Sequence, residues 1–228
     1  MIVSICIPCY EMGGQGPSLL KRSFDQIKNQ TYKDIEIVIS DHSIDDRVEK
    51  MCDEYSSFLN IVYIKNPVDR GNFSSNLNNS IRNSSGEIIK LLMQDDYFLE
   101  NNAIESIVRI FSDSSINWAA CGCYSGWDNV DYNALIPRYE DFSISRGINT
   151  IGSPSVITIR NKDVQYFDEG LSWVVDLDYY KKMYSVFGDP YVLSNYSVFV
   201  QRHANQITNT LPQHKKNAEE FELRRRYA

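Results

Sequence analysis

The sequence of 228 residues has no apolar run that approaches the roughly 18 residues of a membrane-spanning helix, so we expect no membrane span. It also lacks an excess of positive charge, because 30 acidic residues outnumber 23 lysines and arginines. An acidic chain gains no general attraction to a phosphate backbone, which argues against nucleic acid as its main partner. The 43% of hydrophobic residues is enough for a sizeable core and excludes wholesale disorder.

Cysteine is scarce, and its five residues are an odd number. The N-terminus carries no basic region and no cleavage site, so we expect no signal peptide and a reduced, cytoplasmic protein. The pairs Cys6–Cys9 and Cys121–Cys123 do not have the spacing of two zinc knuckles, so we do not expect zinc.

Short apolar runs rich in β-branched residues alternate with helical patterns in the first part of the chain. Strands are expected at 2–8, 35–40, 60–66 and 86–93. One helix is expected to begin at Ser18, which would cap it, and two more are expected at 45–58 and 76–83. Such alternation predicts an α/β fold with a mainly parallel central sheet and helical crossovers.

The second part of the chain continues the alternation. Helices are expected at 102–111, 176–187 and in the tail around 218–228, and strands at 118–126, 153–161 and, as one or two strands, at 191–203. The polar, aromatic stretch 127–149 is interpreted as a substrate loop. Without a repeat, a low-complexity stretch or a convincing linker, residues 1–228 are predicted to form a single domain.

Polar residues follow each of the first four strands. Tyr10 and Glu11 follow the first, Asp41 the second, the region of Arg70 the third, and Asp95 with Asp96 the fourth. Ligands of open α/β sheets bind at the carboxyl ends of the strands, so we expect these side chains to converge.

The segment Gln94-Asp95-Asp96 holds two adjacent carboxylates at the end of a buried strand. Such carboxylates repel each other and lose solvation, and a hard divalent cation with a diphosphate completing its shell would balance them. The alternative is a strand end whose acids are simply solvated.

Five blocks, in order along residues 2–205, resemble glycosyltransferase family 2, the inverting family with the GT-A fold. They read SICIPCYE, EIVISDHSIDD, GNFSSNLNNSIRNSSGEIIKLLMQDDYF, IGSPSVITIRN and FDEGLSWVVDLDYYKKM. The resemblance implies a Rossmann-like GT-A domain with a nucleotide-sugar-binding half at 1–100, an acceptor-binding half at 101–205 and a helical tail at 206–228.

The acidic motif of this family usually reads Asp-x-Asp, whereas this sequence has Met93-Gln94-Asp95. The resemblance implies that Asp95 binds the metal. The missing first aspartate usually helps to hold the ribose of the nucleotide, a contact that Gln94 would replace.

The catalytic base of the family lies at the start of a helix, and Asp176 matches it, although the preceding glutamate has become Val175. A carboxylate within hydrogen-bond reach can take the proton that the acceptor hydroxyl must lose. Asp178 is the competing candidate, and the structural alternative is that Asp176 only starts the helix, where acids complement the dipole.

The nucleotide contacts implied by the resemblance lie in the turn of Pro8, Tyr10 and Glu11, where Tyr10 could stack on the base. Asp41 matches the acid that accepts the uracil N3–H, which makes a UDP-sugar the expected donor. Arg70, Asn76 and Asn78 lie in the block that usually approaches the donor sugar or phosphates, although loop and helix-surface polarity explains them equally well.

His203 ends the last predicted strand, at a position that supplies a metal ligand in several GT-A enzymes. An imidazole ligand favours Mn²⁺ over Mg²⁺, so we predict a divalent metal with manganese preferred and magnesium possible.

Together these features predict an inverting transfer from a UDP-sugar to a hydroxyl group of a carbohydrate or other acceptor. One rival is a sugar-nucleotide nucleotidyltransferase, which should have a glycine-rich, basic loop after the first strand; YEMGGQGPS has no lysine or arginine. The other rival is a non-catalytic nucleotide- or carbohydrate-binding module, an alternative that the missing aspartate and Val175 leave open. The sequence does not specify the sugar, the acceptor or the oligomeric state.

Overall fold

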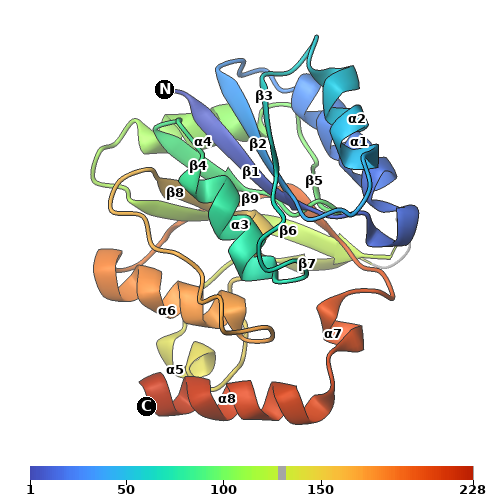
Figure 1. Ribbon diagram of the computed structural model, residues 1–228. Coiled ribbons are helices and arrows are strands. Elements are labelled where there is room, and N and C mark those ends of the chain that lie inside the picture. The colour runs from blue at the N-terminus through green and yellow to red at the C-terminus, as the bar shows by residue number, and fades with distance from the viewer. Residues whose placement is uncertain (128–131, 228) are drawn as a thin grey trace.

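The computed structural model describes residues 1–127 and 132–227 and has an α/β architecture built on one curled sheet (Figure 1). The strands are β1 (Val3–Cys9), β2 (Ile35–Asp41), β3 (Ile61–Lys65), β4 (Ile88–Leu91), β5 (Tyr97–Phe98), β6 (Trp118–Gly126), β7 (Asn133–Leu135), β8 (Ile157–Arg160) and β9 (Tyr191–Gln201). The α-helices are α1 (Gly16–Lys28), α2 (Arg47–Tyr55), α3 (Phe73–Arg82), α4 (Ala103–Phe111), α5 (Asp141–Ile144), α6 (Val175–Phe187), α7 (Ile207–Thr210) and α8 (Gln213–Tyr227). Short 3-10 helices cover η1 (Met12–Gly14) and η2 (Pro154–Val156).

The sheet runs β3-β2-β1-β4-β8-β6-β9-β5 among the described residues, and β7 pairs with β6. The pairs β1–β2, β2–β3 and β1–β4 are parallel, as the alternation of strands and helices predicts. These strands are continuous apolar runs because helices cover the sheet on both faces. The predicted α/β class with a Rossmann-like first half is therefore confirmed.

The second half of the sheet is mixed. β8 pairs antiparallel with both β4 and β6, while β9 pairs parallel with β6 and antiparallel with β5. Because β8 sits directly beside β4, the two predicted halves of the chain share one sheet and one hydrophobic core.

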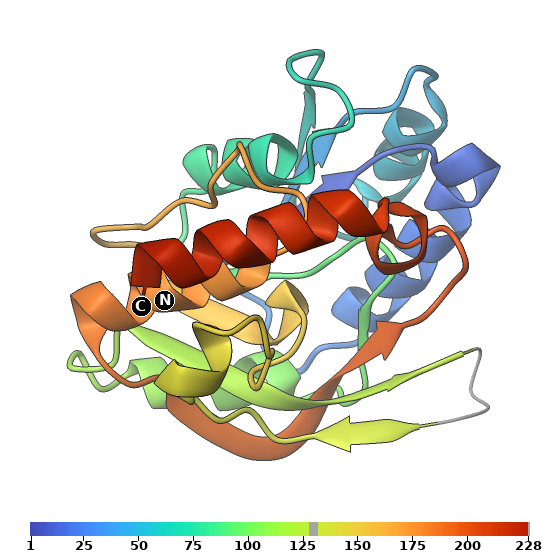
Figure 2. The same cartoon turned by 90° about the horizontal axis from the view of Figure 1, so that it is seen from below.

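The C-terminal helix α8 lies along the outer side of α6 and α5, beneath both in Figure 1, and in Figure 2 it passes in front of α6 and beside α5. The helix α3 packs on β1 and β2, and α1 packs beside α2. None of the described helices has the length and apolar character needed to cross a membrane.

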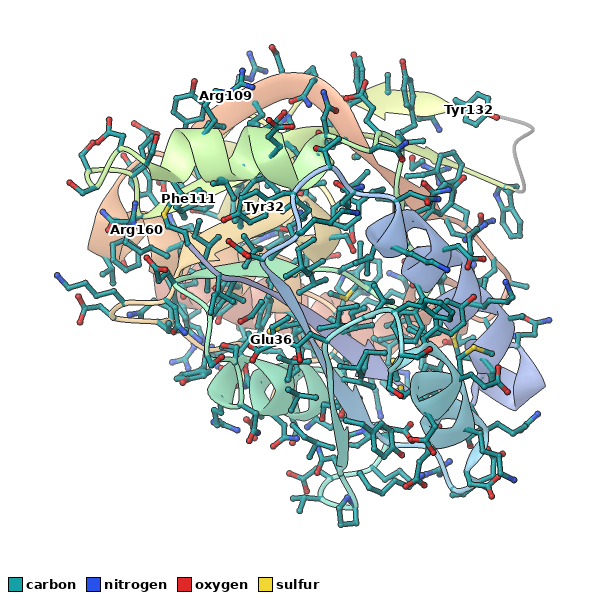
Figure 3. All side chains as sticks on the ribbon, turned by 90° about the horizontal axis from the view of Figure 1, so that it is seen from above. Tyr32, Glu36, Arg109, Phe111, Tyr132 and Arg160 are labelled. Carbon is teal, nitrogen blue, oxygen red and sulfur yellow. The ribbon has the colours of Figure 1, made fainter. Side chains whose placement is uncertain are left out.

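At the edge of the fold remote from the strand carboxyl ends, the half-buried Arg160 and the buried Glu36 make polar contacts between elements. Figure 3 labels Arg160 beside Phe111, and the guanidinium of Arg160 donates to the carbonyl oxygen of Phe111 at 2.8 Å. Glu36, labelled in the same view, accepts the Ser4 hydroxyl at 2.6 Å and the Ser85 amide at 2.9 Å. Glu36 thus joins β2 to β1, and Arg160 joins the end of β8 to the end of α4. Both contacts lie on the side of the sheet opposite the carboxyl ends of the parallel strands.

Several predicted boundaries shift. The helix α1 begins at Gly16 with Pro17 in its first turn, so Ser18 is not its cap and instead donates to the Gln15 carbonyl oxygen at 2.7 Å. The helix α3 begins at Phe73, because Asn72 accepts the Ser75 amide as an N-cap. The start of the strand predicted at 153–161 is the 3-10 turn η2.

The stretch predicted as a loop at 127–149 contains β7 and α5, whose short lengths leave little periodic signal. Its residues 128–131 lie outside the described residues. The prediction missed β5, and the segment 191–203 forms one strand with a register irregularity near Gly122 of β6.

Candidate active site

A cavity of about 590 Å³ opens where β1 and β4 end, at the carboxyl edge of the parallel strands. It is closed on one side by the start of α3 and on another by the segment that follows β9. Most of the residues predicted to bind nucleotide or metal line it, namely Pro8, Tyr10, Glu11, Arg70, Asn76, Gln94, Asp95 and His203. The topology therefore brings together residues that are far apart in the sequence.

Asp95 and His203 meet at the floor of this cavity. The Oδ2 atom of Asp95 lies 3.0 Å from Nε2 of His203, and both side chains are partly exposed. The backbone carbonyl oxygen of Asp95 accepts the Arg22 guanidinium at 2.7 Å, which fixes the loop after β4. The segments after β4 and β9 thus bring one carboxylate oxygen and one imidazole nitrogen side by side.

This pair fits one side of a divalent cation site. Two ligands at adjacent corners of an octahedron lie about 3.0 Å apart when each bond is about 2.1 Å long. The Asp95–His203 separation of 3.0 Å matches that geometry, and it equally suits the hydrogen bond that the two side chains make here. Among the described residues no third histidine, cysteine or acid completes a cluster, so a metal would take its other ligands from a diphosphate and water.

The turn after β1 forms another wall of the cavity, next to this pair. The backbone amide of Tyr10 donates to Oε1 of Gln94 at 3.0 Å, while Nε2 of Gln94 is buried without a hydrogen-bond partner. Tyr10 is 43% exposed, and burial of its hydroxyl together with the nearby Asp95 and Glu11 carboxylates raises its pKa. The half-exposed Tyr10 is available to a ligand, whereas the unpaired amide nitrogen of Gln94 is enclosed by the protein.

Glu11 and Arg70 form an ion pair across the mouth of the cavity. Arg70 also donates from Nε to the carbonyl oxygen of His42 at 2.9 Å, and Glu11 accepts the Ile44 amide at 3.3 Å. This network links the ends of β1, β2 and β3, so the arginine is held at the rim with its charge partly neutralised by Glu11.

Asp41 is fully buried behind the cavity and is not among its lining residues. Its Oδ2 atom accepts the Tyr63 hydroxyl at 2.8 Å and the Lys65 ammonium at 3.1 Å, and its Oδ1 atom accepts the Ser43 amide at 2.8 Å. Protein groups therefore already donate to both oxygens of the Asp41 carboxylate, which the sequence predicts to accept the uracil N3–H.

Asn76 lines the cavity, but both ends of its amide are used within the protein. It donates to the Cys9 carbonyl oxygen at 3.0 Å and accepts the Ser40 hydroxyl at 2.6 Å. Asn78 points elsewhere, donating to the Phe167 carbonyl oxygen and to Glu169 at 2.9 Å each. These two asparagines hold α3 against the strands and a distant loop.

Asp176 lies in the first turn of α6, outside the lining of this cavity, and its carboxylate is held by a neighbouring loop. Its Oδ2 atom accepts the Asn149 amide at 2.5 Å, and its Oδ1 atom accepts the Leu177 backbone amide at 2.9 Å. Burial is the main cause that raises the pKa of Asp176 to about 6. A carboxylate of that basicity is well matched to accept a proton near neutral pH.

Asp178 has a different environment from Asp176. It is fully buried and accepts the Tyr227 hydroxyl at 2.8 Å and the Arg226 guanidinium at 3.2 Å, with Lys182 2.7 Å away. Its contacts to α8 indicate a structural role, so the geometry favours Asp176 over Asp178 as the carboxylate available to a substrate.

Asp96 is turned away from the cavity. Its Oδ1 atom accepts the Gln201 amide at 3.0 Å and its Oδ2 atom the Ser153 hydroxyl at 3.3 Å. Burial, then the charge of Asp95, raises its pKa well above the usual range. Asp96 thus ties β4 to β9 and to the loop that precedes η2, whose Gly152 carbonyl oxygen accepts the Asn149 amide at 2.9 Å.

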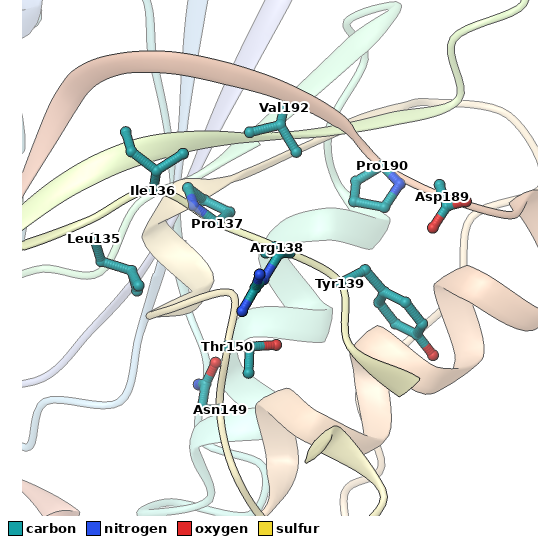
Figure 4. Close-up of a pocket in the computed structure, with 10 residues that line it drawn as sticks. All are labelled: Leu135, Ile136, Pro137, Arg138, Tyr139, Asn149, Thr150, Asp189, Pro190 and Val192. Atoms are coloured by element: carbon teal, nitrogen blue, oxygen red, sulfur yellow. The ribbon is translucent and has the colours of Figure 1, made fainter. Parts of the chain in front are cut away.

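A second cavity of about 780 Å³ lies beside α6 and is lined by residues of the segments 135–139, 149–150 and 189–192 (Figure 4). Figure 4 places Asn149 and Thr150 on one side of it and Asp189 with Pro190 on the other. Asn149 both lines this cavity and donates to Asp176. The carboxylate at the start of α6 therefore has a neighbour that reaches an open space of substrate size.

Sequence reasoning missed several residues at these sites. His42, whose pKa is lowered mainly by burial, lines the first cavity, as do Gln206, Ile207, Thr208 and Thr210 from the tail. From the sequence, Asn149 is covered only as the last residue of the stretch 127–149, which is interpreted as a substrate loop. None of these positions carries a periodic or spaced pattern, and only the polar character of the tail segment hinted at them.

Comparison with known proteins yields a consistent set of likenesses. The profile of the family described as Glycosyl transferase family 2 matches residues 4–167. An uncharacterised glycosyltransferase of Rickettsia typhi is 28% identical over 226 residues, which cover 92% of this chain and 66% of the relative. The chain thus spans slightly less than two thirds of the length of that relative.

Two solved structures share the fold. Staphylococcus aureus TarS 1-349 in complex with UDP-GlcNAc aligns with a TM-score of 0.74 at 14% identity, covering 93% of this chain and 62% of that chain. A mannosyltransferase from Pyrobaculum calidifontis in complex with GDP-Man and Mn²⁺ aligns with a TM-score of 0.59 at 16% identity, covering 98% of this chain and 60% of that chain. At these identities the alignments establish the fold.

Proposed function

The chain belongs to glycosyl transferase family 2, and on this premise we propose that it transfers a sugar from a UDP-sugar to an acceptor hydroxyl with inversion at the anomeric carbon. One observation carries the proposal: Asp95 and His203 lie 3.0 Å apart in a cavity walled by the Tyr10 turn and the Gln94 amide. A cavity of about 590 Å³ has the size of a small-molecule site with a few convergent polar groups.

The donor is proposed to be a uridine nucleotide sugar. The half-open Tyr10 ring offers a stacking face for a base, and Asp41 lies directly behind the wall that His42 contributes. The UDP-GlcNAc held by TarS supports this nucleotide, whereas the GDP-Man held by the Pyrobaculum enzyme makes GDP the natural competitor to test.

Asp95 and His203 are proposed to hold a divalent metal, with manganese preferred because imidazole suits it better than magnesium. When bound, such an ion neutralises the negative charge that develops on the departing diphosphate. Arg70, which lines the same cavity, supplies a further positive group from the protein itself.

Asp176 is proposed to act as the general base. The acceptor oxygen forms the new bond to the anomeric carbon while the bond to the phosphate oxygen breaks, and UDP leaves with the electron pair. The acceptor proton passes to the Asp176 carboxylate, whose pKa of about 6 keeps it ionised at neutral pH. Asn149 holds that carboxylate at 2.5 Å and so fixes its direction.

The acceptor is proposed to be a carbohydrate or another hydroxyl compound that enters beside Asn149. The cavity in Figure 4 supports this side, because it combines apolar surface from Leu135 and Pro137 with the polar Asn149. A cytoplasmic location remains a proposal, supported by five cysteines that are all free and buried.

A screen of UDP-sugars with pure protein and manganese tests the proposal, with release of UDP as the signal. We expect at least one UDP-sugar to be hydrolysed slowly, and the signal to disappear in the Asp95→Ala variant and with a chelator. If a GDP-sugar alone is consumed, the nucleotide assignment is wrong. If no nucleotide sugar is consumed although UDP binds, the chain is a binding module.

A further inference from the structure

The helix that carries Asp176 begins without a capping side chain of its own. Its N-cap residue is Val174, which makes no side-chain hydrogen bond to the first turn. The backbone amides around a helix start need acceptors, and an uncapped start is free to fray. The turn that leads into α6 must therefore be held by groups from elsewhere in the fold.

Glu219 of the C-terminal helix α8 supplies these acceptors. Its carboxylate accepts the backbone amides of Ser172 at 3.0 Å, Trp173 at 2.7 Å and Val174 at 3.3 Å. Successive backbone N–H groups that converge in this way form an anion-binding nest. The carboxylate also lies at the positive end of the α6 dipole, which favours a negative charge there.

Two further contacts on the same side fix the Trp173 side chain to α8. Its indole N–H donates to Oε1 of Glu220 at 3.0 Å, and the Lys216 ammonium lies 4.5 Å from the centre of its ring system. On the other side of Asp176, Tyr227 donates to Asp178 at 2.8 Å. The helix α8 thus forms hydrogen bonds with the chain both before and after the proposed base.

The loop that holds the Asp176 carboxylate is attached to the same helix. Arg224 donates to the Arg146 carbonyl oxygen at 3.2 Å, three residues before Asn149 in the sequence. Both supports of Asp176, its entry turn and its Asn149 partner, therefore rest on α8, as the side-by-side course of α8, α6 and α5 in Figure 2 illustrates.

We propose that Glu219 is a positioning residue for the transfer reaction, which holds the entry turn of α6 so that Asp176 faces the acceptor hydroxyl. This inference rests on the proposed function of Asp176 as the base. Glu219 touches no substrate; it acts through three backbone amides on the helix that carries the base. Misplacing a catalytic group by about 1 Å is enough to lower a rate by ~10²-fold.

The test compares Glu219→Ala with Glu222→Ala, a matched control on the same helix. The Glu222 carboxylate binds Arg225 and Arg226 of α8, so its loss removes an acid of the same helix while the three amide contacts of Glu219 stay in place. Arg226 retains its contacts to Asp168 and Asp178 in this control. At a temperature well below both melting points, we expect Glu219→Ala to lower kcat by ~10-fold or more with unchanged affinity for UDP. Glu222→Ala should keep the wild-type kcat.

A conservative variant and hydrogen exchange complete the experiment. Glu219→Gln retains an acceptor oxygen and should recover much of the lost kcat, and amide exchange over residues 172–177 should accelerate in Glu219→Ala but not in Glu222→Ala. A Glu219→Ala protein with lower thermal stability but a normal kcat would overturn the positioning role. If the wild-type protein transfers no sugar, the proposed function fails; unchanged exchange over 172–177 would separately overturn the contact itself.

Discussion

The donor side and the base side of the candidate site are built in different ways. The donor side consists of strand ends: Asp95 follows β4, His203 follows β9, and Tyr10 follows β1. The base side consists of loops and helices that meet through long-range contacts, in which Asn149 and Glu219 hold Asp176 and its turn. The sheet therefore positions the proposed donor-binding groups, whereas the tail of the chain positions the proposed base.

This difference implies that ligand binding and the chemical step depend on different residues, and that variants can separate the two. Changes at strand ends should affect binding of nucleotide and metal, because those residues line the donor cavity. Changes around α6 should affect the chemical step, because Asp176 lies outside that lining.

The largest effect on the base side is expected for Asp176→Asn, which keeps the shape and removes the basicity. Transfer should fall by ~10²-fold or more while UDP affinity stays nearly unchanged. Steady-state rates together with calorimetric binding of UDP measure both quantities. Wild-type transfer by Asp176→Asn, with loss of transfer in Asp178→Asn, would show that the base is Asp178.

The pH dependence of the rate should follow the same group. Burial raises the pKa of Asp176 to about 6, so the fraction of ionised base falls as the pH drops below that value. We expect kcat to be level at neutral pH and to fall by about tenfold per pH unit on the acid side. A profile that stays flat down to pH values near the ordinary carboxyl pKa of about 4 would contradict this assignment.

The raised pKa of Asp176 also predicts that removing the charge of this carboxylate stabilises the folded protein at neutral pH. A carboxyl whose pKa is higher in the folded state binds its proton more tightly there, so its favourable contribution is complete below the unfolded pKa. That contribution is lost as the pH rises through about 6. Asp176→Asn should therefore melt at a higher temperature than the wild type at pH 7, with the difference shrinking toward pH 4.

A smaller effect is expected at Asp41, where the donor side reaches into the core. Asp41→Ala should lower the free energy of unfolding by ~1–3 kcal/mol, because Tyr63 and Lys65 lose their acceptor. It should weaken UDP binding by a similar amount, because Asp41 also accepts the Ser43 amide and so holds the chain around His42, which lines the donor cavity. Tyr63→Phe is the control, since it removes one partner but leaves the carboxylate. Normal UDP affinity in Asp41→Ala would make Asp41 a purely structural residue.

The smallest effect is expected at His203, the second proposed metal ligand. His203→Ala should weaken manganese-dependent UDP binding on the order of tenfold, or ~1.4 kcal/mol, and reduce the preference for manganese over magnesium. His214→Ala, at an exposed position of α8, is the matched control. If the manganese titration of His203→Ala coincides with that of the wild type, His203 is a structural residue.

The donor side could be predicted from the sequence because its signals are local. An apolar run followed by an acid or an aromatic residue predicts both a strand and the edge at which it ends, which placed Asp95 and Tyr10 together. The sequence did not reveal that Asp41 is enclosed. Its enclosure depends on β3, whose Lys65 pairs in register with Asp41 and whose Tyr63 lies close enough to donate to it.

The base side could be predicted only in part. The position of Asp176 at a helix start is a local feature, whereas its partners come from a loop and from the C-terminal helix. Nothing in the pattern of α8 marks Glu219 among its neighbouring acids, since the partners are backbone amides without a side-chain signature. Contacts of this kind follow from how the helices pack.

The most direct test of the donor site is calorimetric titration of UDP in manganese, repeated with chelator and with Asp95→Ala. We expect UDP to bind in manganese, to lose most of its affinity when the metal is chelated, and to show no metal-dependent binding in Asp95→Ala. Equal UDP affinity with and without manganese, or tighter binding of GDP than of UDP, would contradict a metal-assisted UDP-sugar site at Asp95 and His203.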